Sequence, residues 1–324
     1  MKAWDNIQKL KKKEDGTVVV LVALFIVILL GMTAFALDLG SAYHQSSKLQ
    51  NALDSAALAG AQELPADNEA DSDWTDAKVV AEEFAVYNGY TGVTCQPVHK
   101  NGNTSEKIIG IQVNGSREVE YQFAGVFGVE HGDVSKSATA QLFTAVGMSG
   151  LVPLSLTEEK WSDIDVGEDT IIKFDNKSND DLLSSGWYGP VRIDGSGATE
   201  YRDDFKHGCS TEVHIGDVLE METGNMVGPT EASYEYRISG HESCTYNNHE
   251  GNCPRVVVIP IVKLLDTNKD LQVLGFATLF LKSIEEKGGN ECDITAVFLE
   301  ANFEPDATPG TAIDYGVYKI KLTD

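Results

Sequence analysis

The sequence predicts an α+β fold: an N-terminal transmembrane helix that continues into a long amphipathic helix, a small α+β unit, and a mostly β domain. Three observations lead to this prediction. Residues 17–37 form a 21-residue run without a charge, and a helix-favouring stretch follows it as far as Pro65. Beyond residue 150 most apolar runs are short and separated by Gly-rich turns, which is typical of a sandwich or a partly closed barrel.

Charge divides the chain in two and excludes several partners. The 324 residues include 25 Lys and Arg against 50 Asp and Glu, for a formal net charge of -25. Residues 1–37 hold five lysines and three acidic residues, so residues 38–324 hold the other 20 basic and 47 acidic ones. Such an acidic chain is not expected to bind nucleic acid, because phosphate binding depends on clustered Lys and Arg.

The uncharged run, Thr17 to Leu37, is long enough to cross a membrane as a helix. At 1.5 Å per residue it matches the ~30 Å hydrocarbon layer. A buried core helix rarely lacks a polar face over this length, and a signal peptide has a shorter apolar run before a small-x-small site. Ala34-Phe35-Ala36 imitates such a site only weakly. We therefore expect a retained single span, with residues 1–16 in the cytoplasm and residues 38–324 outside the membrane.

The helix is expected to continue past the membrane to Leu64, because residues 38–64 contain no proline and are rich in Ala and Leu. Pro65 then disfavours a helical conformation at Leu64. Apolar and small residues recur at spacings of three and four along one face: Leu49, Leu53, Ala56, Ala57, Gly60 and Leu64. Two interpretations stay open. This face is either a seam for a partner helix, centred on Leu49, Leu53, Ala56 and Gly60, or it packs on the chain's own ectodomain.

A specific string of residues lies along this helix. A Gly precedes the apolar run, an Asp-x-Gly follows it, and a Leu-Gln-x-Ala-x-Asp-x-Ala-Ala-Leu-Ala string comes next; the residues are Gly16, Asp38, Gly40, Leu49, Gln50, Ala52, Asp54, Ala56, Ala57, Leu58 and Ala59. The segment resembles the N-terminus of the TadG/TadE-like proteins of tight-adherence (Flp) pilus systems. Leu21 stands where a processed prepilin usually has Glu, so we expect no cleavage after Gly16. No Asp-x-Ser-x-Ser string occurs, so no von Willebrand A domain is assigned.

Residues 38–146 are expected to combine the long helix with an α+β unit that resembles the pilin-like half of TadE/TadG-type ectodomains. The pattern predicts an amphipathic helix at Trp74–Asn88 with Val79, Val80, Phe84 and Tyr87 facing inward. It then predicts strands at 92–99, 107–113, 117–123 and 134–143, with a short helix at 124–129 before the last.

Residues 147–150 (GMSG) separate this unit from a β-rich extracytoplasmic domain, residues 151–324. Its strands are predicted at 170–174, 187–193, 255–262, 272–282, 293–300 and 316–322, with helices at 199–207 and 231–238. The run Val256–Val262 should be buried on both faces, and Pro260 within it requires a bulge or a strand edge.

No motif for catalysis or for an organic cofactor is present. The sequence has no Gly-x-Ser-x-Gly and no His-Glu-x-x-His string, and the Gly-rich stretch 224–230 lacks the Lys of a phosphate-binding loop. We therefore expect a protein that is not an enzyme, with no catalytic residues and no cofactor.

The sequence contains two candidate metal sites, and each also has a simpler interpretation. Asp266, Asn268 and Asp270 have the spacing of the first calcium ligands of a loop, but Leu271 and Ala277 replace the Gly and Glu that a full EF-hand needs. A β-turn with a local side-chain hydrogen bond is the competing interpretation. Cys244, His249 and Cys253, with His241 nearby, are a candidate zinc quartet, although zinc sites usually have more closely spaced Cys pairs.

A disulfide between Cys244 and Cys253 is the main expectation for the five cysteines, because thiols outside the cytoplasm tend to pair. The loop between them, CTYNNHEGNC, is polar and turns readily. Cys209 and Cys292 would then form a second pair and Cys95 would stay unpaired. A reducing environment or zinc would leave all five thiols unpaired.

Together with the resemblance, these observations predict an acidic, membrane-anchored cell-surface protein of the structural kind: a non-enzymatic component of a tight-adherence pilus assembly or a related envelope system. Its partners would be the membrane, crossed once, and other Tad proteins or pilin-like helices; self-association is left open. The alternative is a membrane-anchored surface adhesion protein whose β domain holds a ligand.

Overall fold

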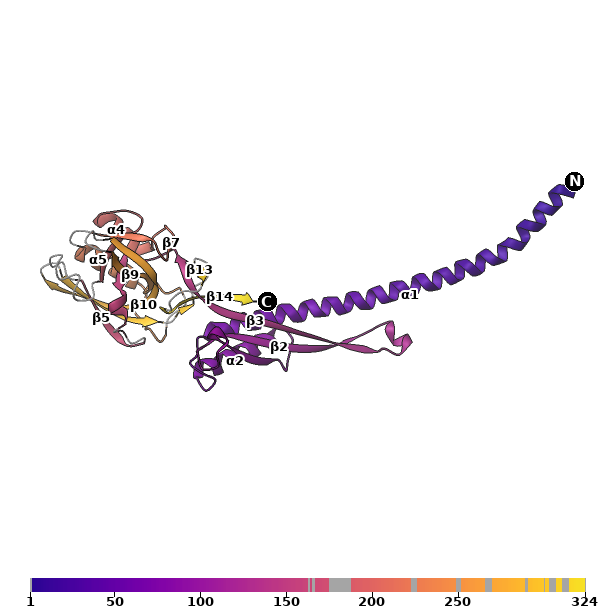
Figure 1. Cartoon of the computed structure of the whole chain (residues 1–324), viewed down its shortest axis with the longest axis horizontal. Helices are drawn as coiled ribbons and strands as arrows, with labels where there is room; N and C mark the ends of the chain where they lie inside the picture. Colours follow the sequence, from indigo (N-terminus) through magenta and orange to yellow (C-terminus); the bar gives the residue numbers. More distant parts are fainter. Residues whose placement is uncertain are drawn as a thin grey trace. The chain divides into compact units, whose positions relative to one another are not determined.

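The computed structural model describes residues 2–162, 164, 167–174, 188–222, 226–248, 252–265, 270–288, 291–299, 301–302, 307–310 and 315–323. The chain forms two compact units, residues 1–140 with 322–324 and residues 141–321 (Figure 1). The division falls inside strand β3 (His131–Met148), a few residues before the Gly-rich stretch where the sequence suggests a boundary.

Helix α1 (Lys2–Gly60) is unbroken through the apolar run and the family-like string. A 3-10 turn, η1 (Ala61–Glu63), follows it, and Leu64 then takes an extended backbone conformation with φ −97° and ψ 158°. The predicted continuous helix is confirmed, and it ends where Pro65 disfavours a further helical residue.

Asp71 is the N-cap of helix α2 (Ser72–Tyr87), and its carboxylate accepts a hydrogen bond from the Asp73 backbone N–H. Its buried residues are Trp74, Ala77, Ala81 and Ala85. The predicted inward face is therefore wrong: Val79, Phe84 and Tyr87 are 48%, 47% and 90% exposed, and Val80 is half-buried. Because α2 lies against Gly60 of α1, its contact face requires small side chains and the larger ones turn outward.

Strands β1 (Thr94–His99), β2 (Ile108–Glu120) and the first part of β3 form the sheet of this unit, with β1 and β2 antiparallel. A short 3-10 helix, η2 (Lys100–Gly102), joins β1 to β2, and another, η3 (Ala124–Phe127), lies between β2 and β3. The sequence divides β2 into two strands around Asn114-Gly115-Ser116, and this division is wrong. A Cβ added to Gly115 would lie 3.1 Å from the Leu53 side chain, so this glycine allows close approach to α1 and does not mark a turn.

The second unit contains a closed ring of strands, so of the two predicted alternatives, a sandwich or a partly closed barrel, the structure resembles the barrel. In the strand order β5-β11-β10-β8-β6-β4-β9, β10 also pairs with β9 and so closes the ring. The ring strands are β4 (Leu154–Thr157), β6 (Tyr188–Arg192), β8 (Val218–Met221), β9 (Val256–Leu265) and β10 (Asp270–Gly288). β11 (Glu291–Leu299) and β5 (Asp169–Phe174) extend the sheet beyond β10.

Short elements complete this unit. The helices are α3 (Glu158–Trp161), α4 (Ala198–His207) and α5 (Val227–Ile238). Strands β7 (Val213–His214) and β13 (Ala307–Gly310) pair with the C-terminal end of β3, and β12 (Ala301–Asn302) pairs with β14 (Val317–Thr323).

Strand β9 is buried on both faces, as predicted. Val257, Ile259 and Ile261 pack in one apolar cluster with residues of α4 and α5, while Val258 and Val262 pack in another with residues of β8 and β10. Pro260 pairs with Phe276, and a register shift lies close by in β10 between Val273 and Gly275, the partners of Val262 and Ile261.

Candidate functional site

The middle third of α1, from Val18 to Leu37, is exposed and apolar on all sides. Every large apolar side chain from Val18 to Leu37 is between 45% and 68% exposed. By length and composition this helix could cross a membrane. A helix that is apolar all round needs an apolar surrounding, and a lipid bilayer supplies one where no protein covers it.

Asp38, the first charged residue after this run, joins α1 to the hairpin of β2 and β3. Its carboxylate accepts hydrogen bonds from the backbone N–H groups of Gln122 at 2.8 Å, Phe123 at 3.0 Å and Ala124 at 2.7 Å. The side chain is only 4% exposed, and these three donors satisfy its buried charge. The sequence singled out Asp38 as part of a motif, but its acceptor role depends on residues more than 80 positions away.

The face of α1 that was a candidate partner seam is covered by the chain itself. Leu49, Leu53 and Ala56 are completely buried. A Cβ added to Gly60 would lie 2.6 Å from the Ala77 carbonyl oxygen and 3.0 Å from the Ala81 Cβ, both on α2. The interpretation as a seam for another protein's helix is therefore wrong for this face, since α2 and β2 occupy it; the internal-packing interpretation describes it.

The polar residues of the same string also contact the sheet of the first unit. The Gln50 side-chain amide donates to the Asp54 carboxylate at 2.8 Å and to the Ser137 carbonyl of β3 at 3.0 Å. Apolar packing on α2 and β2, the Gln50 contact with β3 and the Asp38 contacts with the hairpin together fix the α+β unit to the helix. The string from Asp38 to Gly60 is thus the joint between the exposed apolar segment and the folded part of the first unit.

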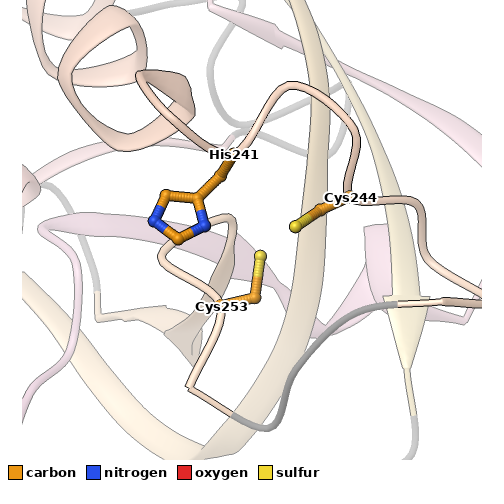
Figure 2. A group of neighbouring side chains, drawn as sticks. All are labelled: His241, Cys244 and Cys253. Carbon is orange, nitrogen blue, oxygen red and sulfur yellow. The ribbon is translucent and has the colours of Figure 1, made fainter.

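His241, Cys244 and Cys253 form a second candidate site, in the second unit. One donor atom from each residue lies within 4.8 Å of the other two, and Figure 2 shows the two sulfur atoms turned toward each other beside the imidazole ring. Cys253 is buried and the other two residues are half-buried. Two thiols and an imidazole are ligands that zinc uses, whereas a disulfide requires the two sulfurs to move to ~2.05 Å. Both chemistries remain open, and His249 lies outside the described residues.

Two buried arginines hold the loop that carries this cluster. Arg255 donates to the backbone carbonyls of Cys244 at 2.9 Å and Leu281 at 2.9 Å, and its guanidinium lies 4.5 Å from the centre of the Phe280 ring. Arg237 donates to the Pro254 carbonyl at 2.7 Å. Burial lowers the pKa of Arg237 to about 10, so the side chain stays cationic at neutral pH. Sequence reasoning assigned neither arginine, because their acceptors are backbone atoms that no motif reveals.

The other predicted site residues lie apart from this cluster. Cys209 is grouped with Asp194 and Asp204, within 4.8 Å, while Cys292 packs in the apolar cluster that contains Tyr201 and Phe205. Their pairing stays a prediction. Burial, and then the charge of Glu82, raise the pKa of Cys95 to about 11, so this thiol is protonated at neutral pH.

Of the calcium candidates, Asp266 and Asn268 lie outside the described residues. Asp270 begins β10 and is paired with Leu265, the last residue of β9. The calcium interpretation and the β-turn interpretation both stay untested.

Comparison with known proteins matches one segment of the chain. Residues 16–63 match the Tad family model, described as Flp pilus-assembly TadE/G-like. No curated protein and no solved structure matches the chain. The matched segment begins just before the exposed apolar run and ends with η1, so it contains the apolar helix and the whole joint described above. Over this segment the chain is similar to the TadE/G-like proteins of Flp pilus assembly.

Proposed function

We propose that the protein is a membrane-anchored, non-enzymatic component of a Flp-type pilus assembly or of a related envelope system. The observation that carries the proposal is the match of residues 16–63 to the TadE/G-like family model on a helix with two different segments. Val18 to Leu37 expose apolar side chains all round, whereas one face of the segment from Leu49 to Gly60 is buried against the chain's own folded unit. A helix with this division anchors a folded unit at a membrane surface.

The charge distribution supports an orientation with the N-terminus in the cytoplasm. Lys2, Lys9, Lys11, Lys12 and Lys13 precede the apolar run, whereas residues 38–324 carry 47 of the 50 acidic residues. Lysines that flank a span favour the cytoplasmic side. The acidic ectodomain would then project from the outer surface of the membrane.

Partner contacts in this proposal use surfaces that the chain leaves uncovered. The 49–60 face of α1 is buried internally, whereas the apolar span and the outer face of α2 are among the exposed apolar surfaces of the first unit. On α2 that outer face holds Val79, Phe84, Val86 and Tyr87, with Val86 56% and Tyr87 90% exposed.

Affinity purification of the tagged full-length protein from mildly solubilised membranes tests this function. The proposal expects pilin or platform proteins of the same pilus system to co-purify. A double variant, Val86→Ser with Tyr87→Ser, should weaken co-purification if the outer face of α2 takes part. Asp76→Asn, an exposed change elsewhere on the same helix, is the matched control. A lone monomer that binds a glycan or an unrelated surface protein would contradict the proposal and favour adhesion.

A further inference from the structure

The loop that joins β2 to β3 is an uncharged apolar tip. Residues 121–129, YQFAGVFGV, contain no charged side chain and are bounded by Glu120 and Glu130. We call these residues the hairpin tip. Its four largest apolar side chains are all exposed: Phe123 42%, Val126 84%, Phe127 84% and Val129 50%. In water this arrangement leaves apolar surface uncovered that folding would ordinarily bury.

The backbone of the hairpin tip is closed on itself. The Tyr121 N–H donates to the Glu130 carbonyl at 2.9 Å, the Val126 N–H to the Phe123 carbonyl at 3.1 Å, and the Val129 N–H to the Ala124 carbonyl at 3.2 Å. Gly128, with φ at 86°, ends η3 in the left-handed conformation that glycine adopts without strain. Internal hydrogen bonds of this kind lower the cost of bringing a backbone into an apolar medium.

The position of the hairpin tip is set by Asp38. This residue directly follows Leu37, the last residue of the uncharged run, and its carboxylate holds the N–H groups of residues 122–124. Figure 1 shows the hairpin running alongside α1 toward the N-terminal half of the helix and ending in the short turn of η3. The tip therefore lies at the point where the apolar helix would leave the hydrocarbon layer.

We propose that the hairpin tip inserts into the interfacial layer of the membrane beside α1, as a second contact of this chain with lipid. The proposal rests on the proposed function in one respect, since it requires that α1 spans the bilayer. Glu120 and Glu130 limit the depth, because their carboxylates stay in water while Val126 and Phe127 enter the lipid. Two separate attachments, the helix and the tip, fix the tilt of the first unit on the membrane surface.

Lipid-quenching measurements on the full-length protein in phosphatidylcholine vesicles test this proposal. A fluorescent amino acid is placed at one of three positions: 127 in the hairpin tip, 29 in the apolar helix, or 87 on α2. Tyr87 is the matched control, since it is an exposed aromatic of the same unit. Its neighbours Asn88, Gly89 and Tyr90 line a hollow with Gln45 and Lys48. Lys48 is ten residues, or about 15 Å, along α1 from Asp38. A label at position 87 is therefore expected to lie well away from the lipid that the hairpin tip would enter.

The expected result is at least twofold quenching at position 127 by phospholipids brominated near the headgroup end of the chain. Position 29 should be quenched more by lipids brominated near the chain ends, and position 87 should change by less than about 1.2-fold. Quenching at 29 without quenching at 127 overturns the hairpin proposal and leaves the span intact. No quenching at 29 overturns the span, and with it the proposed function.

A charge placed in the hairpin tip separates insertion from the tendency of the label itself to bind lipid. Val126→Asp, in the protein labelled at 127, should reduce quenching to the level of position 87, because the new carboxylate resists burial in lipid. Val126 is 84% exposed, so the change removes no internal packing, and an unaltered thermal unfolding midpoint verifies the fold. Persistent quenching in this variant overturns the proposal. So does a label at 127 that crosslinks to a partner protein and not to lipid.

Discussion

Gly60→Ala tests whether the family-like string is an internal joint. Gly60 has helical dihedral angles, φ −63° and ψ −33°, so alanine fits its backbone without strain. The new Cβ would meet the Ala77 carbonyl oxygen at 2.6 Å, the Ala81 Cβ at 3.0 Å and the Ile111 Cδ1 at 3.2 Å. The first contact is with backbone and cannot be relieved by a rotamer change, so α2 has to move away from α1. Overpacking of this kind costs roughly 1–3 kcal/mol.

Hydrogen–deuterium exchange of the α2 amides in the full-length, membrane-reconstituted protein measures this cost locally. At about 1.4 kcal/mol per tenfold change, exchange should accelerate about 5- to 150-fold. Gly40→Ala is the matched control on the same helix, because nothing lies within 4 Å of its added Cβ. Helix propensity alone should make that variant neutral or more stable by up to ~1 kcal/mol. Equal exchange in the two variants would refute the internal joint.

Three further predictions concern single residues. Asp38→Ala should leave the N–H groups of residues 122–124 without their acceptor, which destabilises the hairpin by about 1–3 kcal/mol. Hydrogen exchange of the hairpin amides should speed up about tenfold, while exchange of the α2 amides should not change. Cys244 and Cys253 should resist alkylation until a reductant is added, and peptide mapping in which both are modified without reductant would rule out their disulfide. Burial, then the charges of Asp194 and Glu200, raise the pKa of Asp204 to about 6. The protonated side chain therefore contributes its full stabilisation of the fold below pH ~4, and this contribution is lost as the pH rises through about 6. Asp204→Asn should therefore gain stability over the natural protein between pH 4 and pH 7, by up to about 3 kcal/mol in denaturant unfolding.

Features that depend on residues close together in the sequence were predicted correctly, namely the extent of α1, the burial of β9 and the proximity of Cys244 and Cys253. The absence of proline between residues 16 and 64, and Pro65 after it, define the extent of α1. The run Val256–Val262 identified a strand buried on both faces, because such a strand carries apolar residues without alternation. The short loop between Cys244 and Cys253 brought their sulfurs close, as its turn-forming composition suggested.

Features that depend on tertiary contacts were missed for a physical reason. α2 offers two apolar faces, and large side chains suggested the wrong one, since close approach to Gly60 selects alanines. The acceptor role of Asp38 and the arginine contacts of the cysteine loop join residues distant in sequence. The choice between a partner seam and internal packing on the Leu49–Gly60 face likewise required the position of β2 and α2.

Protease accessibility in intact spheroplasts tests the central claim, that α1 crosses the membrane and carries the ectodomain outside it. A site for a sequence-specific protease is inserted at the exposed loop formed by Asn68, Glu69 and Ala70, after the joint and before α2. Added protease should cut the chain there without permeabilisation and leave an N-terminal fragment of about 70 residues in the membrane. A site that is cut only after the spheroplasts are permeabilised would place the ectodomain in the cytoplasm and contradict the account.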